Sequence, residues 1–180
     1  MDEVIKKTSI DGLFLIQRQT FSDDRGFFKE VARLSEINQQ LGSSFSIAQI
    51  NHSHSEKNVL RGIHAAPWNK LIYIASGSVQ CAIVDLRPES ATFLRFESFI
   101  LGEDNKNALF VSKFLGNSYA VLSDFADYFY FTDQEWQPGK EKSVAWNDPM
   151  INIPWQVEEP ILSEKDKSNP SIKESFPEKF

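Results

Sequence analysis

The chain is poor in cysteine and in long apolar runs. Cys81 is the single cysteine, so no disulfide can form within the chain, and its apolar neighbours predict a buried thiol. No run of 18 apolar residues occurs, and the N-terminal segment mixes charges instead of forming the apolar core of a signal peptide. These absences predict a soluble, cytoplasmic protein that does not enter a membrane.

Positive charge is scarce as well. Lys and Arg number 19 against 25 Asp and Glu, which gives a formal net charge of −6. A nucleic-acid-binding domain usually carries a basic face, and no Lys/Arg cluster occurs here, so we expect no nucleic-acid partner. What is present is a hydrophobic share of 41% in 180 residues, which predicts one globular domain over residues 1–180.

Short segments rich in β-branched and aromatic residues dominate the pattern, and Gly, Asn, Asp and Pro separate them. They predict strands at 12–21, 45–53, 70–87, 92–101, 107–115, 119–131 and 143–155. The residues SGS at 76–78 predict a hairpin turn inside the third of these segments.

One segment has helical periodicity. FKEVARLSEINQQLG (28–42) carries apolar residues at helical spacing and ends at Gly42, a suitable C-cap. Many strands with one short helix predict a mainly β fold, a sandwich or small barrel that can hold one ligand, followed by a polar C-terminal tail at 163–180.

All three histidines lie in NHSHSEKNVLRGIH (51–64), which raises the question of a metal site. His52 and His54 share one face of a predicted strand, as two metal ligands would. Glu56 follows too closely to complete a cupin-type metal motif, and no histidine lies beyond His64. We therefore expect no metal, with His52 and His54 at the surface.

The other face of that strand is polar, and its side chains meet either solvent or a ligand cavity: Gln49, Asn51 and Ser53. Arg61 and His64 are three residues apart, so strict alternation would separate them, but Gly62 permits a bulge that brings both to one site. With Lys70 they form a small cationic cluster in an acidic protein. The spacing alone also fits scattered surface charges around a histidine whose hydrogen bonds are made within the protein.

Seven segments together resemble the dTDP-4-dehydrorhamnose 3,5-epimerase family over nearly the whole chain. In family order they are DDRGFFKE (23–30), QINHSHSEKNVLRGIH (49–64), KLIYIASGSV (70–79), VDLRPESATF (84–93), VLSDFADYFY (121–130), WNDPMINIPW (146–155) and LSEKD (162–166). The resemblance implies a cupin-type β-sandwich or jelly-roll barrel without metal or cofactor. It also implies a homodimer in which the N-terminal segment contributes to the partner's site.

The reaction that the resemblance implies is inversion of C3 and/or C5 in a nucleotide-linked 4-keto-6-deoxy sugar, in deoxysugar and cell-surface polysaccharide biosynthesis. A C–H beside a ketone is a weak acid whose anion delocalises onto the carbonyl oxygen. Inversion needs a base on one face of the sugar ring, a cation or donor at the oxygen, and an acid on the opposite face.

Matched to the family's motifs, His64 resembles the general base and Asp166 the carboxylate that orients it. Lys70 resembles the group at the enolate oxygen, and Tyr130 the proton donor on the opposite face. Without the resemblance, Tyr130 would be interpreted as an aromatic core residue, as Tyr128 is, since Tyr128 does not match.

The resemblance also implies substrate contacts that would let an acidic protein bind a nucleotide diphosphate sugar. These positions are Arg25, Glu30, Gln49, Asn51, Arg61, Asn117, Glu141 and Lys165. Arg25 and Glu30 belong to the N-terminal segment that the family supplies across the dimer.

Four departures from the family pattern surround the predicted pocket. Asn117, in SKFLGNSY (112–119), replaces a histidine, so it can donate a hydrogen bond but cannot act as a base. AAPWNK (65–70) is a shortened loop, Cys81 replaces an aspartate, and Phe131 replaces a lysine. Because the four catalytic positions are intact, we expect catalysis to survive and substrate specificity to shift.

Three alternatives stay open at the level of sequence. A sugar-nucleotide 3,4-ketoisomerase would share the enolate chemistry without needing an acid on the opposite face. A non-catalytic sugar-nucleotide-binding homologue would have kept the pocket and lost turnover, and the residues that favour it are Asn117 and the AAPWNK loop. A metal-dependent cupin oxygenase is the third.

Overall fold

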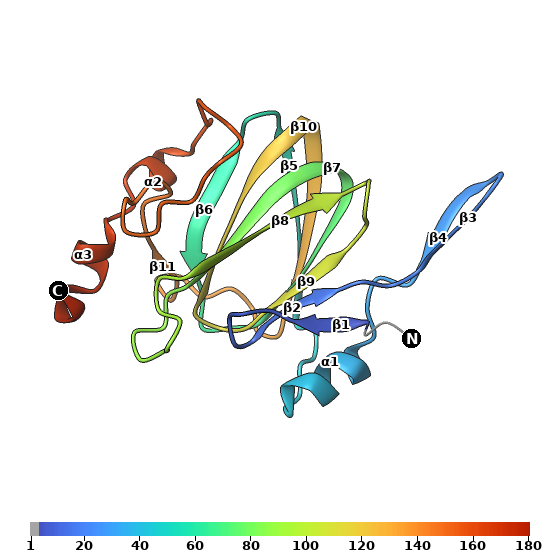
Figure 1. The fold of residues 1–180 in the computed structure, drawn as a ribbon, viewed down its shortest axis with the longest axis horizontal. Helices are drawn as coiled ribbons and strands as arrows, with labels where there is room; N and C mark the ends of the chain where they lie inside the picture. The colour runs from blue at the N-terminus through green and yellow to red at the C-terminus, as the bar shows by residue number, and fades with distance from the viewer. Residues whose placement is uncertain (1–3) are drawn as a thin grey trace.

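The computed structural model describes residues 4–180, and strands form most of its regular structure (Figure 1). The strands are β1 (Ile5–Lys7), β2 (Leu13–Ile16), β3 (Thr20–Asp23), β4 (Gly26–Lys29), β5 (Gln49–Glu56), β6 (Leu60–Ala65), β7 (Lys70–Asp85), β8 (Phe96–Gly102), β9 (Ala108–Val111), β10 (Leu115–Thr132) and β11 (Lys142–Ser143). The helices are α1 (Leu34–Leu41), α2 (Glu164–Lys167), α3 (Ile172–Ser175) and a 3-10 turn, η1 (Pro177–Lys179). The predicted mainly β fold is confirmed.

Two long strands organise the sandwich. β7 has 16 residues and β10 has 18; they pair with each other along their length, and each is long enough to pair with two further strands. β7 pairs with β9 through residues 70–73 and with β8 through 78–84. β10 pairs with β6 through 116–120 and with β5 through 125–132. The antiparallel sheet therefore folds over itself, and its strands curve around a common interior (Figure 1).

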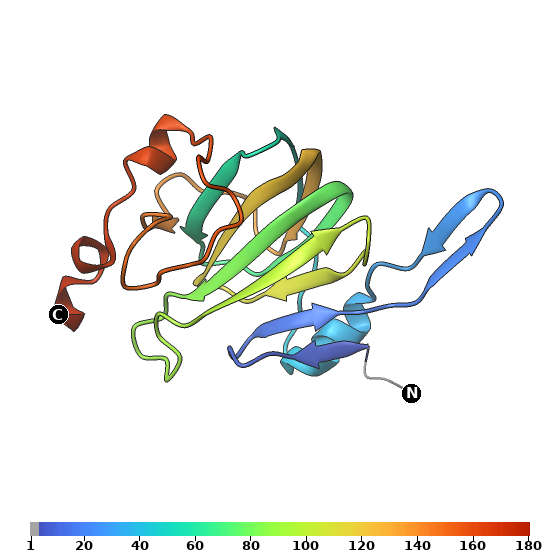
Figure 2. The ribbon, with the colours of Figure 1, turned by 45° about the horizontal axis from the view of Figure 1, so that its top comes forward.

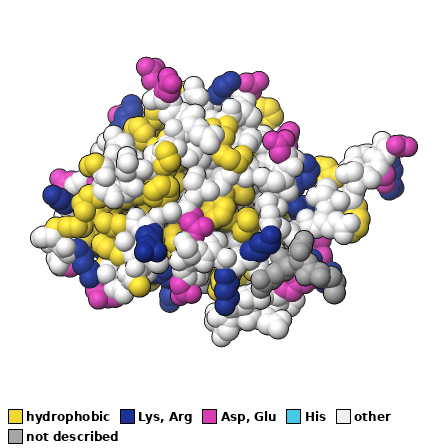
Figure 3. Space-filling model, in the orientation of Figure 1, with side chains coloured by type: hydrophobic (Ala, Val, Ile, Leu, Met, Phe, Trp, Pro, Cys, Tyr) yellow, Lys and Arg dark blue, Asp and Glu magenta, His cyan; other side chains and the backbone are white. Residues whose placement is uncertain are grey.

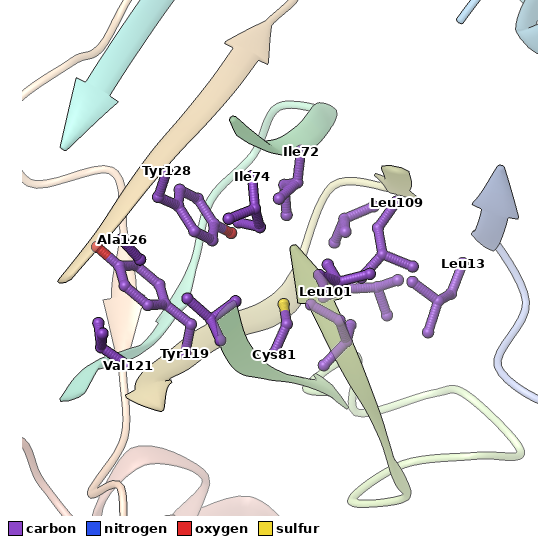
Figure 4. Packing of buried hydrophobic residues seen from close by; sticks show 14 of the residues in the cluster. Leu13, Ile72, Ile74, Cys81, Leu101, Leu109, Tyr119, Val121, Ala126 and Tyr128 are labelled. Carbon is purple, nitrogen blue, oxygen red and sulfur yellow. The ribbon is translucent and has the colours of Figure 1, made fainter. Parts of the chain in front are cut away.

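The interior is filled by apolar side chains from both layers (Figure 4). Ile72, Leu109 and Val121 are fully buried in its largest cluster, and Cys81 lies among them. Burial raises the pKa of the Cys81 thiol to about 12, so the side chain is a neutral part of the core. The expectation of a buried cysteine is confirmed.

The predicted hairpin at 76–78 is wrong. β7 runs without a turn from Lys70 to Asp85, and Gly77 adopts a positive φ of 77° where the strand bends. At that point the partner residue on β10 jumps from Val121 to Ala126. A Cβ at position 77 would lie 2.0 Å from the Phe125 carbonyl oxygen, so the close approach of β10 requires glycine. The glycine serves a bend between layers, not a chain reversal.

The predicted helix begins later than expected. Residues 20–29 form a two-stranded hairpin, β3–β4, whose turn includes Gly26 at a φ of 123°, so Phe28 is in a strand. The helix covers Leu34–Leu41 and ends at Gly42 in the left-handed conformation, as predicted. The hairpin extends away from the body of the molecule (Figures 1 and 2). Cross-strand pairing thus outweighs helical spacing in the first half of the segment.

The predicted strand at 143–155 is mostly irregular. Strand pairing is confined to Lys142–Ser143, and the chain then follows turns. The Asp148 carboxylate accepts backbone N–H groups of Met150 and Ile172, which fixes the turn and ties it to the C-terminal segment. Ile172 and Phe176 are themselves fully buried, so the polar tail is anchored by apolar side chains.

The face shown in Figure 3 has acidic and basic side chains interspersed among apolar ones, in keeping with the mixed charge of the sequence. Within residues 4–180, no helix has the length and apolar character that a membrane crossing requires.

Candidate active site

A cavity of about 530 Å³ opens between β5, β6, β7 and β10, and α2 closes one side of it. All four residues predicted to be catalytic line this cavity: His64, Lys70, Tyr130 and Asp166. So do five of the predicted binding residues: Asn51, Arg61, Asn117, Glu141 and Lys165. Gln49 lines an adjoining space of about 340 Å³, which shares Asn51, Tyr130 and Glu141 with the main cavity. The fold therefore brings together residues that are scattered over the sequence.

A histidine–carboxylate pair lies at the wall of the cavity. His64 Nε2 is 2.6 Å from Asp166 Oδ1, although the two residues are 102 positions apart. Burial acts to raise the pKa of Asp166, but hydrogen bonds from His64, Ser163 and Asn169, with the charge of His64, lower it overall. The carboxylate is therefore ionised and accepts the Nε2 proton, so that in the neutral form of the imidazole Nδ1 is the nitrogen with a free lone pair.

Local structure explains both members of this pair. Asp166 stands in the first turn of α2, whose N-cap is Ser163; the serine hydroxyl accepts the backbone N–H of Asp166 and donates to its carboxylate. His64 reaches the cavity because β6 is bulged. His64 faces Asn117 and Arg61 faces Tyr119, so two β6 residues oppose one β10 residue between them.

Gly62 is at the centre of that bulge. Its φ is 131°, and a Cβ there would lie 2.4 Å from the Cβ of Ser118. The predicted bulge is confirmed, and it places Arg61 and His64 on the same cavity. The Nε of Arg61 donates to the hydroxyl of Ser55, which directs the base of the guanidinium group.

Lys70 and Tyr130 form a second pair of neighbouring side chains in the cavity. Lys70 is 5% exposed, and its Nζ lies 5.9 Å from the centroid of the Tyr130 ring. Burial lowers the pKa of Lys70, and the negative charge of Glu141 partly offsets this. Burial first, and Glu141 second, raise the pKa of Tyr130. The tyrosine therefore holds its proton at neutral pH, as a proton donor must before it reacts.

Two predicted binding residues lie elsewhere. Arg25 is in the β3–β4 hairpin, where its side chain is 89% exposed and pairs with Asp23. Glu30 follows β4 and accepts from Arg18 and Arg33, each at 2.7 Å. Within one chain, neither residue lines the cavity.

His52 and His54 are about half exposed, in keeping with the predicted surface position, although His52 is also among the residues that line the cavity. Their ring nitrogens lie 2.8 and 2.9 Å from the same oxygen of Asp127. The His52 ring stacks on Phe129, and the His54 ring stacks on Phe125. The two imidazoles are thus held by a carboxylate and two aromatic rings on the neighbouring strand.

Sequence reasoning missed several lining residues: Ile50, His52, Tyr119, Tyr128, Trp136 and Ser163. Ser163 had a signal, because a serine three residues before an aspartate is a helix N-cap pattern. Tyr119 and Tyr128 stack with ring centroids 4.1 Å apart, which no local sequence pattern indicates. Trp136 lies in the irregular segment after β10 and likewise had no signal.

An antiparallel β-sandwich that encloses a ligand-sized polar cavity defines the cupin-like class of proteins. Within that class, the family model described as dTDP-4-dehydrorhamnose 3,5-epimerase matches residues 7–174, and the chain belongs to this family. The dTDP-4-dehydrorhamnose 3,5-epimerase of Escherichia coli K12 is 37% identical over 166 residues, 89% of this chain and 90% of that protein.

Solved structures agree with this membership. A 4-keto-6-deoxy sugar epimerase from the novobiocin biosynthetic gene cluster of Streptomyces spheroides matches with a TM-score of 0.93 and 27% identity, over 97% of this chain and 89% of that one. A dTDP-6-deoxy-D-glucose-3,5-epimerase of Legionella pneumophila, in complex with dTDP-4-keto-L-rhamnose, matches with a TM-score of 0.87 and 33% identity, over 93% and 91%.

Proposed function

We propose that this protein is an isomerase that inverts C3 and/or C5 of a nucleotide-linked 4-keto-6-deoxy sugar in deoxysugar biosynthesis. The observation that carries the proposal is the convergence of the His64–Asp166 pair, Lys70 and Tyr130 on one cavity. Membership of an epimerase family supports the same reaction.

In the proposed mechanism, Nδ1 of His64 removes the proton from a carbon beside the ketone. Asp166 stabilises the imidazolium that forms, and Lys70 donates to the oxygen on which the negative charge develops. Tyr130 then gives a proton to the same carbon from the opposite face, which inverts it. The tyrosinate regains a proton from solvent and His64 releases its own, so the enzyme returns to its starting state.

The proposed ligand is a nucleoside diphosphate sugar. Arg61 and Lys165 supply positive charge for the diphosphate, and Asn51, Asn117 and Glu141 supply polar contacts for the sugar. The Legionella relative bound to dTDP-4-keto-L-rhamnose supports this class of ligand. A 3'-monoepimerase of Streptomyces bikiniensis, 30% identical and bound to dTDP-quinovose, supports it too.

We further propose a homodimer in which the β3–β4 hairpin reaches the partner's cavity. Phe21, Phe27 and Phe28 are 56%, 54% and 71% exposed on this hairpin, an unusual density of apolar surface for a free arm. The same arm carries Arg25, and Glu30 follows it, so both would reach the second site.

A complementation experiment tests the shared site. Arg25→Ala and His64→Asn proteins are each expected to have low activity, and co-refolding them should restore up to one intact site per heterodimer. If each site used only its own chain, the mixture would gain nothing over the two variants measured apart.

The ketoisomerase and the non-catalytic homologue are not favoured, since the named relatives are epimerases. The decisive experiment offers the purified protein the 4-keto-6-deoxyglucose derivatives of dTDP, GDP, CDP and UDP, and identifies the products by NMR. We expect inversion at C3, C5 or both for one of them. Recovery of a 3-keto sugar, or of unchanged substrate in every case, would contradict the proposal.

The same panel tests whether the departures around the pocket change specificity. If the dTDP compound reacts at both carbons as readily as with a typical family member, the expected shift in specificity is wrong.

A further inference from the structure

Cys81 and Asn117, two residues that depart from the family pattern, contact each other where the cavity borders the apolar core. The thiol of Cys81 lies 3.8 Å from Oδ1 of Asn117, and the hydroxyl of Tyr128 donates to the same oxygen at 3.1 Å. Tyr128 and Cys81 are 1% and 0% exposed and belong to the main apolar cluster (Figure 4). Asn117 is partly exposed and lines the cavity, so one end of its carboxamide faces the core and the other faces the ligand space.

The side chains of Tyr128 and Cys81 determine the orientation of the Asn117 carboxamide. Burial raises the pKa of Tyr128 well above its usual value and that of Cys81 to about 12, so both groups carry a hydrogen at neutral pH. The amide oxygen has two lone pairs and can accept from both. A reversed amide would point an N–H group, instead of an acceptor, at these two buried hydrogens, which is unfavourable in an apolar core. Nδ2 of Asn117 therefore faces the cavity.

That amide group is available to a ligand. Among residues 4–180, Nδ2 of Asn117 donates to no protein acceptor. Asn117 is the direct cross-strand neighbour of His64, and such neighbours have side chains about 4.5–5.5 Å apart at Cβ. A donor at this position reaches an atom next to the one that His64 deprotonates.

The chemistry of the substrate identifies that atom. His64 acts on C3 or C5, and the carbon adjacent to both is C4, which bears the ketone oxygen. We propose that Tyr128 and Cys81 are positioning residues that aim the amide of Asn117 at this oxygen. The inference rests on the proposed epimerase reaction and assigns its second oxyanion donor, beside Lys70.

A donor to the ketone oxygen contributes more to the transition state than to the bound ketone, because the oxygen gains negative charge during deprotonation. Its loss therefore lowers kcat and leaves KM nearly unchanged. The amide is also neutral, so it continues to donate at a pH where a buried lysine has lost its charge.

The test combines three variants in a double-mutant cycle. Tyr128→Phe keeps the ring that stacks on Tyr119 and removes the donor to Asn117; kcat should fall about fivefold, the value of one hydrogen bond. Asn117→Ala should lower kcat about 100-fold. In the double variant, Tyr128→Phe should have no additional effect, because the contact with Asn117 through which it acts has gone. Tyr73→Phe, outside the cavity, is the matched control and should keep full activity.

Asn117→Asp keeps the oxygen that accepts from Tyr128 but presents a second acceptor to the ligand. It should lose as much kcat as Asn117→Ala, with thermal unfolding confirming that each variant is folded. Full activity of Asn117→Asp, additive losses in the double variant, or an effect on KM alone would overturn the inference. Absence of turnover in the wild type would instead overturn the proposed function, and the inference with it.

Discussion

Two histidine–aspartate clusters occur among residues 4–180, and they have similar distances between histidine and carboxylate but different surroundings. In the cavity, His64 lies 2.6 Å from Asp166, and the two side chains are 24% and 5% exposed. At the surface, His52 and His54 lie 2.8 and 2.9 Å from Asp127, and the imidazoles are 49% and 53% exposed. The distances alone would not separate a catalytic pair from a surface cluster.

The surroundings separate them. Asp166 is held by Ser163 and by Asn169 in addition to His64, so its orientation is determined from several sides. Asp127 is simply the registered neighbour of His54 on β10, and both imidazoles share one of its oxygens. A pair that orients a base for proton transfer needs the first arrangement, because a fixed tautomer and a fixed ring direction depend on a fixed carboxylate.

The largest expected contrast is between His64 and His54. His64→Asn keeps a donor for Asp166 but removes the base, and turnover should fall about a thousandfold. His54→Asn is the matched control, because His54 does not line the cavity, and it should leave turnover unchanged. Steady-state rates of product formation measure both. A full rate for His64→Asn would show that the cavity pair is not the base.

Substitutions of the two aspartates, Asp166 and Asp127, should show the same contrast in kcat, with a smaller loss than for His64. Asp166→Asn leaves an amide that no longer selects the Nε2-protonated tautomer of His64, and kcat should fall roughly 100-fold. Asp127→Asn is the surface control. Equal effects of the two substitutions on kcat would remove the distinction between the clusters.

The pH dependence of kcat gives a further test of the cavity cluster, because Glu141 affects the pKa values of both Lys70 and Tyr130. Its negative charge raises the pKa of Lys70 and of Tyr130. Removing that charge lowers both pKa values, so both groups lose their protons at lower pH. The alkaline limb of the kcat–pH profile of Glu141→Gln should therefore move to lower pH. A shift to higher pH would contradict these assignments.

The smallest effect is expected from dismantling the surface cluster altogether. Exposed ion pairs contribute little to stability, since water and salt screen them. The double variant His52→Ala, His54→Ala should change the melting temperature by less than about 2 °C. Differential scanning calorimetry at low and high salt would show a larger role if one exists.

Sequence alone could predict the fold class and the polar inner face of β5, because both depend on local composition and period-two alternation. The same reasoning mistook Gly77 for a turn, since a glycine with positive φ serves a bend between layers as well as a hairpin. The pairing of strands, which decides between the two, is a long-range property.

The site shows the same division. Gly62 indicated the bulge that joins Arg61 to His64, whereas the contact between His64 and Asp166 spans 102 residues and was reached through family resemblance. The contacts of Asn117 with Cys81 and Tyr128 join residues that are adjacent only in space, so no sequence pattern indicates them.

The most direct test of the account is proton NMR of the wild-type protein in heavy water with the 4-keto-6-deoxyglucose derivatives of dTDP, GDP, CDP and UDP, each offered separately. The account predicts that the C3 or C5 proton signal disappears as deuterium enters, that the product has the opposite configuration at that carbon, and that the carbonyl stays at C4. Retention of both proton signals in all four compounds, or migration of the carbonyl to C3, would contradict it.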